Sequence, residues 1–214
     1  MKKFYYLLFV LSFMTGANAK VVTFTNTHFK AKLLLSDPTN NIAKDLSGNP
    51  IKIDANSNGE IEFSEALNVK YLDITFNPNN YFSKIYDVSG LENFTNLASF
   101  ICVDNSISSL NLNALTALQY LNCSLNSMTS LNVTSNNNLT TLLCWSNGLT
   151  SLDVSNKPNL TYLNCSQNNL SALNLNNSNN ITNLEFGSNH LPVLNLNHLS
   201  NLSYLECSSI RLHL

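Results

Sequence analysis

Hydrophobic and polar positions recur along this chain with a fixed period of 21 residues. One column of the repeat holds Phe or Leu: Phe100, Leu121, Leu142, Leu163, Leu184 and Leu205. Two residues later comes a column of Cys with one Phe: Cys102, Cys123, Cys144, Cys165, Phe186 and Cys207. Three residues after that stands an asparagine column: Asn105, Asn126, Asn147, Asn168 and Asn189. A fixed period of roughly 20–50 residues predicts a solenoid of stacked coils.

The full unit reads L-x-x-L-x-C-x-x-N-x-L-x-x-L-x-L/V, which is the leucine-rich repeat pattern. The L-x-C triplet alternates with period two, so both of its residues should point inward from a short strand. Each Asn falls where the chain leaves the strand, and its amide can bond backbone groups there. The predicted fold class is an α/β solenoid, a leucine-rich repeat array with a parallel, concave β-sheet.

The five cysteines are expected to be buried free thiols. They share one inward column, and their number is odd. A buried Cys side chain commonly behaves as a small hydrophobic group. Disulfides or a metal site are the alternatives, and the odd count and the identical inward orientation disfavour disulfide bridging.

Residues 1–19 match a secretory signal. Lys2 and Lys3 precede an apolar run, and Ala17 and Ala19 form a small-residue cleavage site. The apolar run is too short to span a bilayer. We therefore expect an exported bacterial protein that is secreted or exposed at the cell surface.

The rest of the chain divides into three segments. Residues 20–68 lack the period and are expected to form a small, partly helical N-terminal cap, with a helix over 28–36. Residues 69–96 should form irregular first coils. Residues 97–214 carry the regular repeats, of which the last is incomplete.

The cap contains an EF-hand-like loop over residues 54–65. It matches D-x-[DN]-x-[DN]-G-x5-E, with Gly59 at the sharp turn. Its predicted calcium ligands are Asp54, Asn56, Asn58, the Glu60 carbonyl, Glu62 and Glu65. Oxygen donors suit Ca²⁺, so a structural calcium site is expected. Because Gly48 and Pro50 replace an incoming helix, an Asn-rich polar turn is the alternative.

The outward positions of the predicted strands define a candidate binding face. Its residues are Tyr120, Leu143, Trp145, Tyr162, Glu185, Tyr204 and Glu206. We expect Trp145 to be exposed, with Leu143 beside it and Tyr120 and Tyr162 flanking it on adjacent strands. Exposed Trp and Tyr are typical recognition anchors. The alternative is that these aromatics only stack on their cross-strand neighbours.

The C-terminal end of the array carries apolar residues without a polar cap. These are Leu202, Leu205, Ile210 and Leu212. Arrays of this kind normally need a capping repeat for solubility. Two interpretations follow: self-association through this edge, or a truncated form of a longer repeat protein, which the pattern favours.

Other function classes find little support. The chain has no H-E-x-x-H, glycine-rich phosphate loop or nucleophile elbow, so an enzyme is not expected. The formal charge is −2 and Arg211 is the one arginine, which disfavours nucleic-acid binding. Beyond residues 1–19, nothing in the sequence predicts a membrane span.

Two repeats, LQYLNCSLNSMTSLNV and LTYLNCSQNNLSALNL, resemble internalin-like bacterial leucine-rich repeat proteins of the cysteine-ladder class. The loop DANSNGEIEFSEA is similar to a segment found ahead of the array in exported Bacteroidetes repeat proteins. The resemblance covers residues 55–207. It implies adhesion or protein recognition through the concave sheet, while the chain departs from it by lacking a wall-anchoring or sorting motif.

The sequence thus predicts an exported module that binds an extracellular protein partner on its concave face. A carbohydrate-binding module that uses Trp145 and its neighbouring tyrosines is the first alternative. A fragment of a larger repeat protein without independent function is the second.

Overall fold

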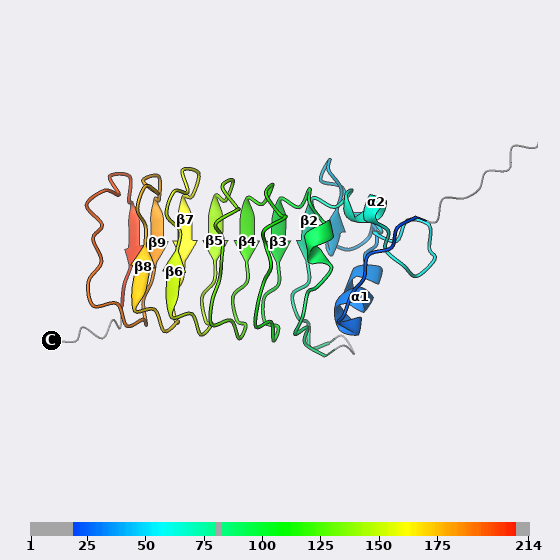
Figure 1. Cartoon of the computed structure of the whole chain (residues 1–214), viewed down its shortest axis with the longest axis horizontal. Coiled ribbons are helices and arrows are strands. Elements are labelled where there is room, and N and C mark those ends of the chain that lie inside the picture. Colours follow the sequence, from blue (N-terminus) through cyan, green and yellow to red (C-terminus); the bar gives the residue numbers. More distant parts are fainter. Residues whose placement is uncertain (1–18, 80–82, 209–214) are drawn as a thin grey trace, which may run out of the picture.

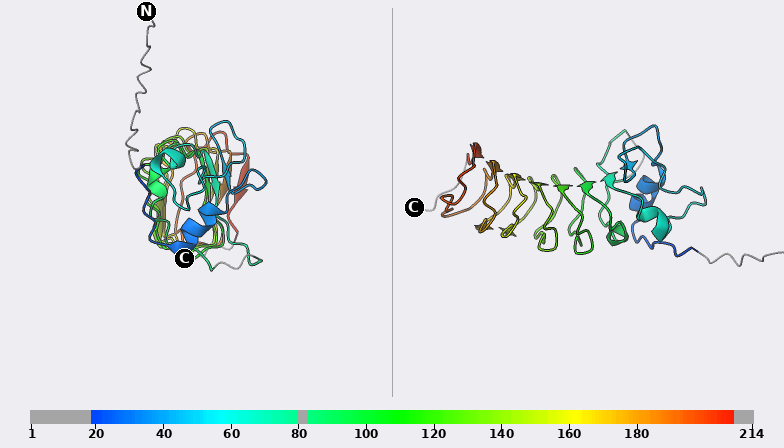
Figure 2. Two further views of the ribbon diagram at one scale, coloured as in Figure 1. Left: turned by 90° about the vertical axis from the view of Figure 1, so that its right-hand side faces the viewer. Right: turned by 90° about the horizontal axis from the view of Figure 1, so that it is seen from above.

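The computed structural model describes residues 19–79 and 83–208 as an elongated solenoid with a cap at its N-terminal end (Figure 1). Successive coils lie side by side along the long axis, and their strands build one continuous sheet. Seen from above, the strands follow a shallow arc whose hollow side is the outer face of the sheet (Figure 2). The predicted leucine-rich repeat fold is therefore confirmed, with a concave sheet face.

The main sheet has eight strands in the order β1-β2-β3-β4-β5-β7-β9-β10. β1 pairs antiparallel to β2, and all the later pairs are parallel. The strands are β1 (Ala43–Lys44), β2 (Tyr71–Asp73), β3 (Ser99–Ile101), β4 (Tyr120–Asn122), β5 (Thr141–Leu143), β7 (Tyr162–Asn164), β9 (Asn183–Glu185) and β10 (Tyr204–Glu206). From β3 onward the pairing register equals the 21-residue period, so each sequence column becomes a row across the sheet.

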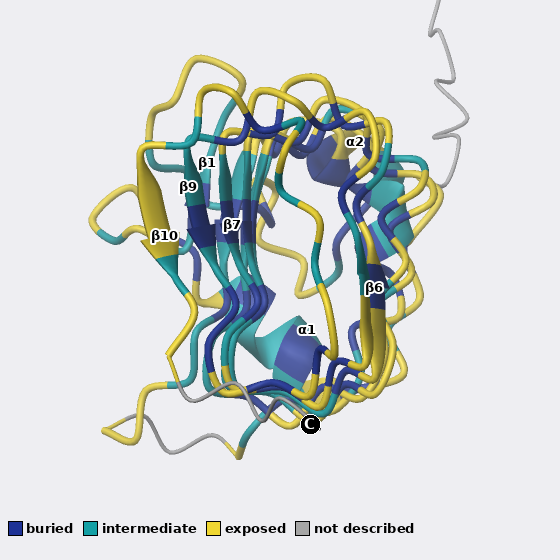
Figure 3. Cartoon of the chain, turned by 90° about the vertical axis from the view of Figure 1, so that its left-hand side faces the viewer, coloured by how far each residue is buried: buried dark blue, intermediate teal, exposed yellow. Residues whose placement is uncertain are grey.

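The opposite side of the solenoid is built from turns and short strands rather than helices. β6 (Ser151–Asp153) and β8 (Ala172–Asn174) form a separate parallel pair there, across the core from the main sheet (Figure 3). A single 3₁₀ turn, η1 (Leu91–Asn93), lies ahead of the regular coils. A coil of 21 residues leaves few residues for the segment that leads back to the next strand of the main sheet. Extended segments therefore take the place of the helices that the predicted α/β class implies.

The cap holds the two α-helices of the described residues. α1 (Thr27–Leu34) begins where Asn26 Oδ1 accepts the Phe29 amide proton at 2.9 Å, and it buries Phe29 and Leu33. This Asx cap starts the helix one residue earlier than the sequence predicted. α2 (Phe63–Ala66) is a single turn that closes the EF-hand-like loop.

The core is one continuous apolar cluster that runs from the cap through all the regular coils. Leu121, Leu142 and Leu163 are fully buried, as are the first four cysteines of the ladder. All five cysteines are free, as predicted, but only the first four are buried, because Cys207 lies in the last described coil, which no further coil covers. Burial raises the pKa of Cys123 and Cys165 to about 12, so these thiols stay protonated and unreactive near neutral pH.

The asparagine column forms a hydrogen-bonded ladder that connects consecutive coils. Asn168 Nδ2 donates to the carbonyl of Cys165 in its own coil and to that of Cys144 in the preceding coil, both at 3.0 Å. Its Oδ1 accepts the Leu149 amide proton at 3.0 Å. Asn126, Asn147 and Asn189 repeat the pattern, which confirms the predicted role of this column.

We expect Asn168→Asp to lower the free energy of unfolding by about 2–4 kcal/mol. The substitution replaces Nδ2 with a carboxylate oxygen, which would face the two carbonyl oxygens without a proton to donate. The matched control is Asn179→Asp, which makes the same charge change at an exposed asparagine. Urea unfolding followed by circular dichroism measures both variants. Equal midpoints for the two would contradict the structural role of the ladder.

Candidate ligand-binding face

The predicted face residues occupy two rows on the concave sheet. Tyr120, Tyr162 and Tyr204 lie in the row that passes through Ser99, and Leu143, Glu185 and Glu206 lie in the row that passes through Ile101. Tyr204 is the most open of them, with 49% of its surface exposed, whereas the others are half-buried. All of them point away from the core, as the strand alternation predicted.

Trp145 lies two residues beyond the end of β5, and its neighbours differ from those expected. Tyr120 and Tyr162 both pair with Thr141, so they flank that residue and not Trp145. The Trp145 carbonyl instead accepts from Leu125, and Ser146 bonds Ser166 of the following coil. Trp145 is half-buried rather than fully exposed. Its place past the strand explains the difference, because Trp145 lies four positions beyond Thr141, the β5 residue in the tyrosine row.

A hollow of about 230 Å³ opens beside Trp145 on the C-terminal half of the face. Glu185 and Glu206 line it together with Asn164, Ser166 and Gly187. The structure thus brings together three of the predicted site residues, Trp145, Glu185 and Glu206. The other four do not line this hollow: Tyr120, Leu143, Tyr162 and Tyr204. Polar and aromatic groups that converge in a concave site are typical of ligand recognition.

Glu185 is held by donors from the preceding strand. Tyr162 Oη donates to Glu185 Oε1 and Asn164 Nδ2 donates to Oε2, both at 2.6 Å. The bond to Glu185, with burial adding to it, raises the pKa of Tyr162 to about 12. Tyr162 is therefore a positioning group for a carboxylate as well as part of the aromatic row.

Glu206 is held by its own coil and by the preceding one. Its Oε1 accepts from the Ser208 amide at 2.9 Å and from the Ser208 hydroxyl, while Oε2 accepts from the Gly187 amide at 3.3 Å. The bonds from Ser208 hold the pKa of Glu206 below its usual value. A Cβ atom at Gly187 would lie 2.5 Å from Glu206 Oε2, so only glycine permits this approach.

Asn164, Ser166 and Gly187 line the hollow although the sequence pattern did not predict them as site residues. Asn164 stands one period before Glu185, and Gly187 stands two periods after Trp145. Those spacings place Asn164 directly beside Glu185, and Gly187 in the row of Trp145 two coils further on. The repeat therefore contained the signal, but small and amide side chains do not stand out in a chain so rich in Asn and Ser.

The EF-hand-like loop brings several of its predicted ligands into contact. Asn56 Nδ2 and Asn58 Nδ2 donate to the two Glu62 oxygens at 3.3 and 2.7 Å. The Asp54 carboxylate accepts the amide protons of Asn58 and Gly59 at 3.0 and 3.1 Å. Asp54 and Glu62 are nearly buried, at 5% and 4% exposure. The loop therefore gathers oxygen-bearing side chains around the Glu62 carboxylate.

The remaining two predicted ligands are engaged elsewhere. Glu60 pairs with Lys30 through its side chain at 2.7 Å, which leaves its backbone carbonyl as the predicted donor. Glu65 accepts the amide protons of Ala55 at 2.7 Å and Glu62 at 3.0 Å. Burial raises the pKa of Glu65, and the nearby Glu62 carboxylate adds to this. Glu65 thus acts as half of a capping box for α2.

Two features that the described residues lack bear on the site. Within residues 19–79 and 83–208, no group of three or more His, Cys, Asp or Glu side chains is arranged to hold a metal ion. A calcium shell in the loop would thus depend on the Asn side chains and a backbone carbonyl as well as the carboxylates. In the same part of the chain, no helix has the length and apolar character needed to cross a bilayer.

β10 is the last strand of the sheet within the described residues, and the inward side chains of its coil are exposed to solvent. Leu205 is 43% exposed and Cys207 is exposed, although the equivalent residues of earlier coils are buried (Figure 3). Leu202 is half-buried. Ile210 and Leu212, also predicted to line this edge, lie outside the described residues, as do positions 1–18 of the predicted signal.

No protein-family model and no curated protein matches the chain. Solved structures do match it. An internalin, InlF, of Listeria monocytogenes is similar over 58% of this chain and 38% of its own, with 31% identity and a TM-score of 0.55. The functional domain of InlJ from the same organism, which includes a cysteine ladder, is similar over 91% of this chain and 49% of its own, with 26% identity and a TM-score of 0.50.

A leucine-rich repeat protein of Leptospira interrogans shows the same fold at 18% identity, over 70% of this chain and 45% of its own, with a TM-score of 0.55. The chain spans less than half the length of these solved chains. The fold and the repeat define a leucine-rich repeat module, a class suited to protein interaction. Its 21-residue period and cysteine ladder make it an internalin-like leucine-rich repeat protein, and its solved neighbours are repeat proteins of this type rather than enzymes.

Proposed function

We propose that this chain is an exported binding or adhesion module that recognises an extracellular protein through its concave face. The hollow that Trp145, Glu185 and Glu206 line together carries the proposal, because it places an aromatic ring and two carboxylates on the outer side of a rigid sheet. Tyr204 extends the aromatic surface beside it. Aromatic residues at the centre of a concave surface are the usual anchors of protein interfaces.

Export is supported by the sequence pattern of residues 1–19 and by the likeness to internalins. The proposed binding role concerns this module alone, since the two solved internalin chains are more than twice as long as the part that matches this chain.

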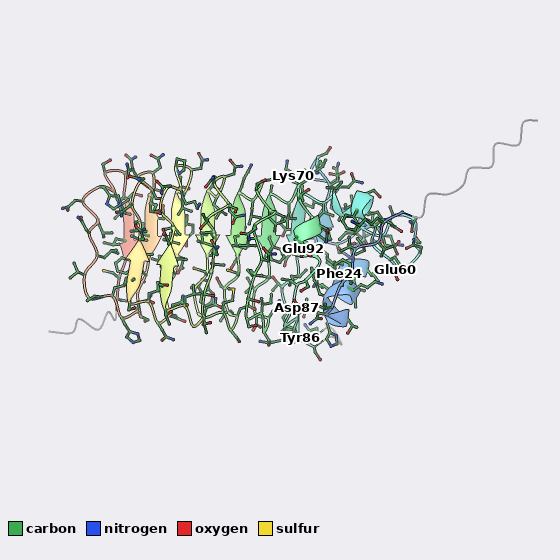
Figure 4. The ribbon with its side chains drawn as sticks, viewed as in Figure 1. Phe24, Glu60, Lys70, Tyr86, Asp87 and Glu92 are labelled. Carbon is green, nitrogen blue, oxygen red and sulfur yellow. The ribbon has the colours of Figure 1, made fainter. Side chains whose placement is uncertain are left out.

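We expect the double variant Trp145→Ala and Tyr204→Ala to lose at least about 30-fold in affinity for its partner, since removing an interface anchor costs roughly 2 kcal/mol or more. The control is Tyr86→Ala, which removes an exposed tyrosine at the cap end of the molecule (Figure 4). The assay is binding of the purified chain from Lys20 onward to a panel of purified extracellular proteins and soluble glycans. Circular dichroism verifies that the variants are folded.

Three outcomes separate the functions. The proposal is supported if the parent chain and the Tyr86 variant bind a protein that the double variant does not bind. Binding confined to glycans would replace it with the carbohydrate-binding alternative, in which a sugar ring stacks on Trp145. Protein binding that the double variant retains would place the interface on another surface.

We also propose that the EF-hand-like loop binds Ca²⁺ in a structural role, at about 10⁻⁴–10⁻³ M as in extracellular modules. The all-oxygen donor set and the gathering of Asn56, Asn58 and Glu62 support this. Calcium would hold the loop against the cap, in competition with the two backbone hydrogen bonds of Glu65.

Millimolar CaCl₂ should raise the melting temperature of the chain and give a saturable heat in calorimetry. Asp54→Asn should abolish both effects, because it removes the charge at the first loop position. Glu92→Gln, a carboxylate change outside the loop, is the control and should keep both. Absence of heat and of any thermal shift in the parent chain would show that the loop is a polar turn.

A third proposal is self-association through the edge at β10, which the exposed Leu205 and Cys207 support. Sedimentation velocity under reducing conditions should show a mass that grows with concentration. Leu205→Lys should return the chain to a monomer, and Leu46→Lys, at an equally exposed leucine of the cap, should not. A constant monomer mass over the whole series would rule this edge out as an interface.

A further inference from the structure

The hollow beside Trp145 carries negative charge that the described residues do not balance. Glu185 and Glu206 are direct lateral partners in the pairing of β9 and β10. Like charges at directly opposite positions destabilise a sheet. The ion pairs in the described part of the chain are Lys30–Glu60 and Lys84–Asp104, both far from this hollow in the N-terminal half. The two carboxylates are thus a structural cost that no ion pair among the described residues offsets.

The carboxylate of Glu185 retains capacity to accept further hydrogen bonds. Each of its two oxygens takes one donor, Tyr162 Oη or Asn164 Nδ2, whereas a carboxylate offers about four acceptor sites. One site on each oxygen therefore remains, which is the arrangement that a two-pronged donor needs. Tyr162 and Asn164 also fix the orientation of the group, so little side-chain entropy would be lost on binding.

Glu206 supplies the second charge from a fixed position. Its Oε1 is used by Ser208, and its Oε2 takes only long bonds, 3.3 Å from the Gly187 amide and 3.4 Å from Ser166 Oγ. Gly187 makes this position possible, since a Cβ there would meet Oε1 and Oε2 at 2.8 and 2.5 Å.

Trp145 forms an aromatic wall of the same hollow. An indole face attracts cations, and a planar guanidinium can stack on it while donating to a neighbouring carboxylate. Two adjacent carboxylates and an indole suit a cation better than a neutral sugar, because a neutral ligand would leave the repulsion between Glu185 and Glu206 in place. The forked donors of arginine match the two remaining sites of Glu185 better than the point charge of lysine.

We propose that this hollow binds the guanidinium of an arginine side chain on the partner protein, with Glu185 as the bidentate acceptor, Glu206 as the second charge and Trp145 as the stacking surface. The inference deepens the proposed function and rests on it, since it names the chemistry that the partner presents to this face.

The emission of Trp145 reports directly on the hollow, because it is the one tryptophan of the chain. The purified chain is titrated with the peptide acetyl-Gly-Arg-Gly-amide and, separately, with the same peptide carrying citrulline, the neutral isostere of arginine. Calorimetry runs in parallel, so that binding without a spectral change is still detected. We expect saturable binding of the arginine peptide at about millimolar concentration, weakened by added salt, and no binding of the citrulline peptide.

Substitutions test the assigned roles. The double variant Glu185→Gln and Glu206→Gln should bind the arginine peptide at least about tenfold more weakly. Its melting temperature should stay equal or rise, because the change removes a like-charge pair. Glu92→Gln, whose carboxylate accepts from the Gly90 amide far from the hollow, is the control and should bind as the parent does. Gly187→Ala should also weaken binding, since it displaces Glu206.

Three results would overturn the proposal: equal binding of the citrulline peptide, unchanged binding by the double glutamine variant, or no heat and no emission change with the arginine peptide. None of these affects the test of the proposed function. If the arginine peptide fails while the Trp145 and Tyr204 variant still loses its protein partner, the face binds protein by other chemistry. If the arginine peptide binds and the panel shows no protein partner, the proposed function fails on its own.

Discussion

The asparagine ladder is the constraint on which the rest of the structure depends. Each ladder amide donates to carbonyls of two consecutive coils and accepts an amide proton from the preceding coil, as Asn168 does with Cys144, Cys165 and Leu149. These backbone groups are buried at the turn and would be costly to leave unpaired. One side chain thus fixes the offset between coils at one repeat, and the sheet register follows from it. With the register fixed, every outward position has a defined neighbour.

The fixed register explains how a chain with few charges builds an acidic hollow. Glu185 and Glu206 occur one period apart, so the fold places them side by side despite their repulsion. Donors from adjacent coils, Tyr162 to one and Gly187 to the other, keep both carboxylates oriented. A face of this kind is rigid before any ligand arrives, which lowers the entropic cost of binding.

The cap solves a different physical problem, because the first coil would otherwise expose its apolar side. Phe29 and Leu33 of α1 cover that side, and β1 extends the sheet by one antiparallel strand. The loop that ends at α2 is tied to the segment ahead of α1 by two backbone hydrogen bonds, from the Val22 amide to the Ile61 carbonyl at 2.8 Å and from the Phe63 amide to the Lys20 carbonyl at 2.9 Å. Here no repeat fixes the neighbours, so a network of side-chain and backbone hydrogen bonds does so instead.

The sequence by itself determined the period, the inward columns, the free thiols and the rows of the concave face, because a repeat with a constant length allows one register. It also identified Trp145, Glu185 and Glu206 as outward residues. Only the tertiary structure decided that Trp145 lies beyond β5, among serines and near the two glutamates, and that the tyrosine row flanks Thr141. It also decided that the return side has strands in place of helices. Periodicity predicts which residues lie side by side on adjacent strands. The depth of a hollow, the hydrogen-bond donors to a carboxylate and the path of a turn depend instead on packing in three dimensions.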